Sequence, residues 1–220
     1  MGAAQMKRIA NGLVLSAGVI TMTGTIASAD NIVPPPWTRF EPFTTFQEWD
    51  FNNPGQIIPD GDAQGNFFNE GKPNDTPVAT PGAGVAWQDN GTYLGSGSPD
   101  SYIEFFCPNW IDLEPIKLVW IQINGAWPAG LPPTVESIFG QKGTLPPYAG
   151  SPSGSDEFAP GFHRTELWTL QPNPDFEFIR IFIPEGVLVN QVVIDTISFP
   201  APGAIAAFGL AGLAVSRRRR

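Results

Sequence analysis

The stretch DGDAQGNFFNE has the densest spacing of side chains that could bind a metal ion. Asp60, Asp62 and Gln64 alternate ahead of Gly65, as oxygen ligands do in D-x-D-x-x-G calcium loops. The closing acid, Glu70, falls one place early for the twelve-residue loop, and no helix signal flanks the stretch. The pattern leaves two interpretations, a calcium-binding loop and a solvated turn rich in Asp and Gly. Calcium is the only cofactor that the sequence suggests.

Tryptophan is the second residue type with a chemical use, because an exposed indole ring can cover the apolar face of a sugar. Trp110 and Trp127 fall in the loop-like contexts CPNWID and GAWPAG, and Trp37 follows a proline run. Trp110 and Trp127 are candidates for glycan contact, with loop anchoring by packing as the alternative. The other four lie in strand-like segments and are expected in the core: Trp49, Trp87, Trp120 and Trp168.

Catalytic patterns are sparse in this chain. His163 is the only histidine, so a metal site built on several histidines is excluded. It could pair with Glu166 or Asp156, but no G-x-S-x-G supplies a nucleophile for a hydrolase triad. Two acids for glycoside hydrolysis could come from any strands, Glu104 and Glu177 being candidates. We therefore predict that the protein is not an enzyme, with a secreted glycan hydrolase as the weakest alternative.

Cys107 is the only cysteine, so neither an internal disulfide nor a cysteine zinc cluster can form. Its neighbours, Phe105 and Phe106, predict that it is a small buried hydrophobic residue.

Charge is distributed unevenly over the 220 residues. Six of the twelve Lys and Arg lie in the first eight or the last four residues, whereas all twenty-one Asp and Glu lie between Asp30 and Asp195. The body therefore has six basic against twenty-one acidic residues, a net charge of −15. Such a surface repels phosphate backbones, so we expect no nucleic acid partner.

Seven segments have the composition of β-strands, since each is rich in β-branched or aromatic residues and is bounded by turn formers. They are residues 44–51, 84–89, 101–107, 116–124, 165–171, 176–184 and 187–199. Segment 116–124 has apolar residues on both faces, as a strand in the middle of a sandwich does. We therefore expect an all-β fold, a single antiparallel β-sandwich of jelly-roll type.

The connections between these strands are expected to be long and rich in Pro and Gly, above all residues 52–83 and 125–164. PPPW, residues 34–37, predicts an extended lead into the domain. Pro184-Glu185-Gly186 is expected to close a hairpin between the last two strands.

The N-terminus has the layout of a secretory signal peptide. Two basic residues are followed by an apolar stretch from about Leu13 and by Ala27-Ser28-Ala29 before Asp30. Ala27 and Ala29 are the small residues that signal peptidase needs. We expect residues 1–29 to be the signal, with cleavage after Ala29.

The C-terminus combines a short apolar run, residues 203–215, with the cluster Arg217, Arg218, Arg219 and Arg220. As a helix these thirteen residues would span about 20 Å, which is short of a bilayer core of about 30 Å unless the helix begins near Ile197. The arginines would hold the far end in the cytoplasm.

This ending resembles the PEP-CTERM sorting signal of Gram-negative bacteria, over about the last twenty-one residues. Pro200 and Pro202 match the motif's prolines, residues 204–215 the helix and Arg217 to Arg220 the tail, while Ala201 replaces the family's central Glu. The resemblance implies that the inner membrane holds the chain until an exosortase processes it at the motif. It also implies an exopolysaccharide setting.

We therefore expect three parts: a signal peptide (1–29), an extracellular β-sandwich (30–199) and a sorting signal (200–220). The leading hypothesis is a non-catalytic protein of the cell surface or extracellular matrix, whose partners during export are signal peptidase and exosortase. The alternative is a lectin-like module that binds extracellular polysaccharide, with or without calcium.

Overall fold

The computed structural model describes residues 33–39, 41, 43–53, 76–109, 114–159 and 161–199. Within these ranges the regular elements are all β-strands, which confirms the all-β class. No helix that could cross a membrane is found in this described part of the chain.

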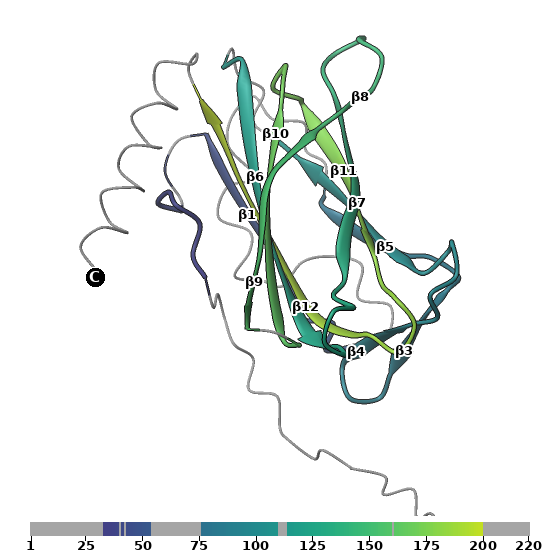
Figure 1. Cartoon of the computed structure of the whole chain (residues 1–220). Coiled ribbons are helices and arrows are strands. Elements are labelled where there is room, and N and C mark those ends of the chain that lie inside the picture. The colour runs from purple at the N-terminus through teal and green to yellow at the C-terminus, as the bar shows by residue number, and fades with distance from the viewer. Residues whose placement is uncertain are drawn as a thin grey trace, which may run out of the picture.

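One antiparallel sheet has seven strands (Figure 1). Six of its strands follow the order β3-β4-β12-β6-β10-β9. The seventh, β1, pairs with the long strand β12, which also pairs with β4 and β6. The bounds are β1 Thr44–Trp49, β3 Val85–Gln88, β4 Thr92–Gly95, β6 Ile116–Ala126, β9 Ser151–Ala159, β10 His163–Leu170 and β12 Leu188–Phe199.

The second antiparallel sheet has five strands in the order β2-β5-β11-β7-β8. Its strands are β2 Val78–Pro81, β5 Tyr102–Pro108, β7 Thr134–Gln141, β8 Tyr148–Ala149 and β11 Phe176–Phe182. The two sheets face each other in Figure 1.

The hydrophobic core lies between the sheets. Alternate residues of β6, Val119, Ile121 and Ile123, are fully buried and belong to one cluster with Ile179 of β11. Residues from both sheets also meet directly, since the ring of Trp49 in β1 lies edge-on to a ring of β5, that of Phe105, at 4.8 Å between centroids. Burial of these apolar faces is the main force that holds the sheets together.

All seven strand predictions are confirmed, with boundaries that differ by a few residues. The central position of segment 116–124 is also confirmed, because β6 lies between β12 and β10. Cys107 is fully buried in the core, as its apolar neighbours predicted.

The predicted hairpin between the last two strands is wrong. The turn exists, with Gly186 at φ 74° and Val187 N–H donating to Pro184 O at 3.2 Å. However, β11 pairs with β5 and β7, whereas β12 pairs with strands of the other sheet. Both edges of each strand are already occupied, so the turn carries the chain from one sheet to the other.

The prediction that residues 125–164 form a loop is also wrong, since β7, β8 and β9 lie there. The sequence of β9, SPSGSDEFA, is rich in turn-forming residues. It becomes a strand because it hydrogen-bonds along β10, with two register shifts. Two shorter strands, β2 and β4, were missed as well, and β2 falls in the other predicted loop.

Candidate binding site

The outer face of the five-stranded sheet has a row of three phenylalanines. Phe178 of β11 lies directly opposite Phe106 of β5 on one side and opposite Phe139 of β7 on the other. Phe176 is two residues before Phe178, on the same face. The ring centroids of Phe106, Phe176 and Phe178 lie 5.3 to 5.8 Å apart in tilted and edge-on arrangements. We call these four residues the aromatic face.

Two rings of the aromatic face are open to solvent. Phe178 is 39 % exposed and Phe139 is 46 % exposed. Both strands already supply the core from their opposite faces, through Ile179 and Ile138, so the core does not require these rings. A contiguous group of exposed large apolar side chains marks an interaction site more often than an isolated one does.

A polar row borders the aromatic face. Arg180 of β11 is ion-paired with Glu104 of β5, with 2.8 Å between Nη2 and Oε2, and both side chains are about one-third exposed. The guanidinium also lies over the ring of Tyr102, 4.2 Å from its centroid. The hydrogen bond to Glu104 raises the pKa of Arg180 above its ordinary value. This part of the sheet therefore presents aromatic rings beside hydrogen-bonding groups.

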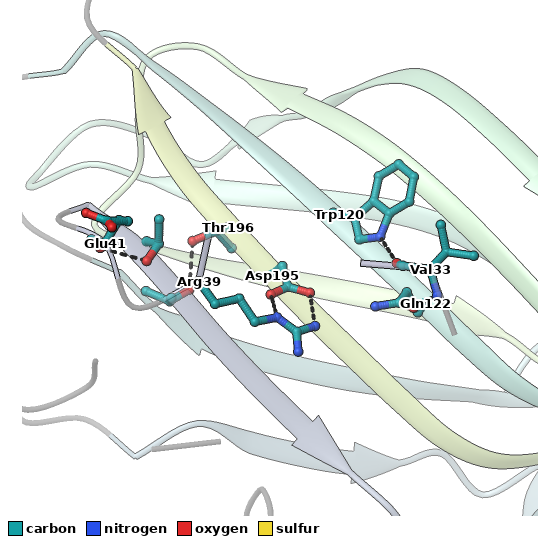
Figure 2. Close-up of polar contacts among 9 residues, drawn as sticks. Val33, Arg39, Glu41, Trp120, Gln122, Asp195 and Thr196 are labelled. Atoms are coloured by element: carbon teal, nitrogen blue, oxygen red, sulfur yellow. Dashed lines mark hydrogen bonds and ion pairs between the residues drawn. The ribbon is translucent and has the colours of Figure 1, made fainter. Parts of the chain in front are cut away.

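The outer face of the seven-stranded sheet is covered in part by the N-terminal segment, residues 33–39 (Figure 2). Trp120 Nε1–H donates to Val33 O at 3.2 Å, and Val33 N–H donates to Gln122 Oε1 at 3.1 Å. The guanidinium of Arg39 donates two hydrogen bonds to the carboxyl group of Asp195, from Nε to Oδ1 at 2.5 Å and from Nη2 to Oδ2 at 2.7 Å. The extended lead predicted from PPPW thus lies along a sheet surface.

A chain of hydrogen bonds crosses four strands of the same outer face. His163 Nδ1 bonds Asn124 Oδ1, Asn124 Nδ2 donates to Gln191 Oε1, and Gln191 Nε2 donates to Glu48 and Asp50 at 2.6 and 2.8 Å. His163 begins β10 and is fully buried. Burial lowers its pKa. These contacts join strands and form no hydrolase triad.

The two acids considered for glycoside hydrolysis are separated by the sheet. Glu104 lies on the outer face, beside Arg180, whereas Glu177 is fully buried on the inner face. A strand directs neighbouring side chains to opposite faces, so these two acids cannot flank one sugar bond.

Trp127 lies just after β6 and is only 7 % exposed. Its indole N–H donates to Glu157 Oε1 at 2.7 Å, and this bond, with a second from the backbone of Gly161, lowers the pKa of Glu157. Beside it is a shallow, mostly apolar hollow of about 410 Å³ that Phe162 and Leu188 also line. Most of the ring is already covered, and its role in ligand binding stays a prediction.

The other predicted site residues lie outside the described part of the chain. They are Ala27, Ala29, Asp60, Asp62, Gln64, Trp110, Pro200, Ala201, Pro202, Arg217, Arg218, Arg219 and Arg220. Among the residues that are described, no group of three or more His, Cys, Asp or Glu could hold a metal ion. Calcium binding by the Asp60 stretch therefore stays a prediction.

Sequence reasoning missed the aromatic face, although one signal for it exists. In FEFIRIF both alternating sets contain apolar residues, Phe176 and Phe178 on one face and Ile179 and Ile181 on the other. Such a strand can be covered on both sides or can expose one apolar face, and the pattern does not distinguish these cases. No family model, curated protein or solved structure matches the chain.

Proposed function

We propose that the chain is an exported, non-catalytic protein of the cell surface or extracellular matrix whose body binds a neutral polysaccharide through the aromatic face. We also propose that the two sheets form a sandwich of jelly-roll type. The observation that carries the binding proposal is the row of Phe106, Phe178 and Phe139 across three strands.

The chemistry of the face fits a sugar chain better than other occupants. A pyranose ring has an apolar face and polar edges, so it suits a surface where aromatic rings adjoin hydrogen-bonding groups. Arg180 and Glu104 provide such groups and neutralise each other. The body carries a net charge of −15, which repels acidic polymers. A neutral glycan is therefore the ligand class that the face favours.

Export is supported by the two ends of the sequence. The signal peptide ending at Ala29 directs the chain across the inner membrane, and the Pro200-Ala201-Pro202 ending with its arginine tail holds it there as an intermediate. Processing by an exosortase then releases the acidic body to the surface or matrix. Extracellular polysaccharide is the partner available in that setting.

Titration of the purified protein against soluble neutral glucans, mannans and xylans, followed by calorimetry or affinity electrophoresis, tests the binding proposal. Phe178→Ala and Phe139→Ala should each weaken binding about tenfold, since a lost ring contact of ~1.4 kcal/mol has that effect. Both rings are partly exposed, so the variants should fold normally.

Phe162→Ala is the matched control, because Phe162 is 58 % exposed but lies outside the aromatic face, beside Trp127. It should bind as the wild type does. Loss of binding in Phe162→Ala but not in Phe178→Ala would move the site to the Trp127 hollow. A dimer that Phe178→Ala dissociates, with no response to any glycan, would instead make the face a contact between two copies of the chain.

A further inference from the structure

A second group of polar side chains lies inside the core, between the two sheets. Lys117 is fully buried on the inner face of β6, two residues before the core residue Val119. Glu177 is fully buried on the inner face of β11, two residues before Ile179. Burial of ionised groups is costly. A buried amine from one sheet and a buried carboxyl from the other therefore require a chemical explanation.

Asn109 connects the two sheets at this place. It follows β5 and is fully buried, and its Nδ2 donates to Glu177 Oε2. Thr196 Oγ1, on the inner face of β12, donates to Asn109 Oδ1 at 3.5 Å. The carboxamide is therefore in contact with a carboxyl of the five-stranded sheet and a hydroxyl of the seven-stranded sheet.

Lys117 faces the same place from β6. It lies opposite Ser198 in the β6–β12 register, so Thr196 is its diagonal neighbour on β12. The Cα atoms of diagonal neighbours lie about 7–8 Å apart, a separation that a long side chain can span. Cys107 gives an independent indication, since it lies directly opposite Glu177. Burial raises the pKa of its thiol, and the charge of Glu177 raises that pKa further while the charge of Lys117 lowers it. Both charges therefore act on one sulfur atom.

We propose that Lys117 and Asn109 become joined by an intramolecular amide bond, with Glu177 as the group that moves the proton. The lone pair of the neutral Lys117 Nζ attacks Asn109 Cγ and forms the new N–C bond. Glu177 accepts a proton from Nζ and delivers it to Nδ2, the Cγ–Nδ2 bond breaks, and ammonia leaves. An amine and a carboxamide become a secondary amide and ammonia, so the step needs no oxidant, reductant or co-reactant.

The core supplies the conditions for this reaction. Burial favours the neutral form of an amine over the ammonium ion, and the neutral form is the nucleophile. Contacts with Glu177 and Thr196 hold the carboxamide in one position, which lowers the entropic barrier to attack. The product ties the end of β5 to the beginning of β6, one strand of each sheet. Because Cys107 is the only cysteine, an internal disulfide cannot provide a cross-link between the sheets.

Peptide mass spectrometry of the full chain, purified from the cells that produce it, tests the proposal. Trypsin should not cleave after Lys117, and the peptide that spans it should be lighter by one ammonia, about 17 Da. Glu177→Gln and Lys117→Met should restore the unmodified mass. Glu104→Gln, at a surface ion pair, is the control and should keep the lower mass.

Asn173 provides a second control, because its buried Nδ2 donates to Ser198 Oγ at 3.1 Å, next to the same lysine. Asn173→Ala should keep the lower mass. A wild-type chain that trypsin cleaves at an unmodified Lys117 overturns the proposal, and so does a fragment spectrum that places the link on Asn173. The wild-type peptide mass tests the amide bond even if Lys117→Met does not fold. A failure of the protein to bind glycans would not affect this test of the amide bond.

Discussion

Asp195 lies on β12, in the outer face that the N-terminal segment covers (Figure 2). Burial raises its pKa to about 6, and the bonds from Arg39 offset only part of that effect. Because the folded-state pKa lies above the ordinary value of 3.8, the folded protein binds this proton more tightly than the unfolded chain does. The contribution of Asp195 to stability is therefore fully present below about pH 4 and is lost as the pH rises through about 6.

Asp195→Asn removes this titration but keeps an oxygen that can accept from Arg39. Relative to the variant, the wild type should lose about 2 kcal/mol of unfolding free energy between pH 4 and pH 7, which is most of the full effect of the shift at 1.36 kcal/mol per pKa unit. Urea unfolding at four pH values in this range measures the difference. His163 titrates in both proteins, so its effect cancels. Parallel stability curves for the two proteins would contradict the assignment.

Single residues also differ in how far their positions could be predicted. Cys107 was placed in the core from its neighbours alone, and it is there. Phe178 lies in FEFIRIF, a segment that is also rich in apolar residues, but it is 39 % exposed. The difference arises because hydrophobicity determines only the free energy that a side chain gains on burial. Whether the side chain is exposed depends on whether another element covers its face of the sheet.

Gly125 shows how a strand pair can depend on one missing side chain. It lies in β6 where the register with β12 shifts, and a Cβ added there would lie 1.9 Å from Leu188 O. Backbone atoms cannot move aside as a flexible side chain can. We therefore expect Gly125→Ala to lower the free energy of unfolding by about 3 kcal/mol or to prevent folding, as overpacking does.

Gly154 of β9 is the matched control for this prediction, since an added Cβ would meet nothing within 4 Å. Gly154→Ala should change stability by less than about 0.5 kcal/mol. Chemical denaturation of both variants checks the pair. Equal stabilities would show that the β6–β12 register can shift to make room.

At the level of elements, the strong strands were predictable and the weak ones were not. Segments such as 116–124 have enough apolar and β-branched residues to specify a strand locally. The sequence of β9 does not, and it is a strand because β10 offers it a row of backbone hydrogen-bonding groups. An edge strand of this kind is specified by its neighbour more than by its own side chains.

At the scale of the whole molecule, the described part of the chain is all-β and the body is acidic, and the two proposed terminal signals predict how the protein reaches its site. Mass spectrometry of the protein from the extracellular or surface fraction should show a chain that starts at Asp30 and ends between Pro200 and Pro202. An intact Arg220 in that fraction would contradict the sorting proposal. If the sorting proposal is right, a chain in which alanines replace the four arginines should not be held as the membrane intermediate, because the proposal relies on those charges to keep the tail in the cytoplasm.

The sequence by itself determined the fold class and the seven main strands, because period-two alternation and turn-forming residues are local properties of the chain. Only the tertiary structure decided that Pro184 to Gly186 joins two sheets, that Phe106, Phe139 and Phe178 share one outer face, and that Lys117, Asn109 and Glu177 are all buried. Alternation defines two faces for each strand but not what covers them. That coverage depends on pairing between residues far apart in the sequence. The candidate binding site depends on the same pairing, because it is a face that no other described element covers.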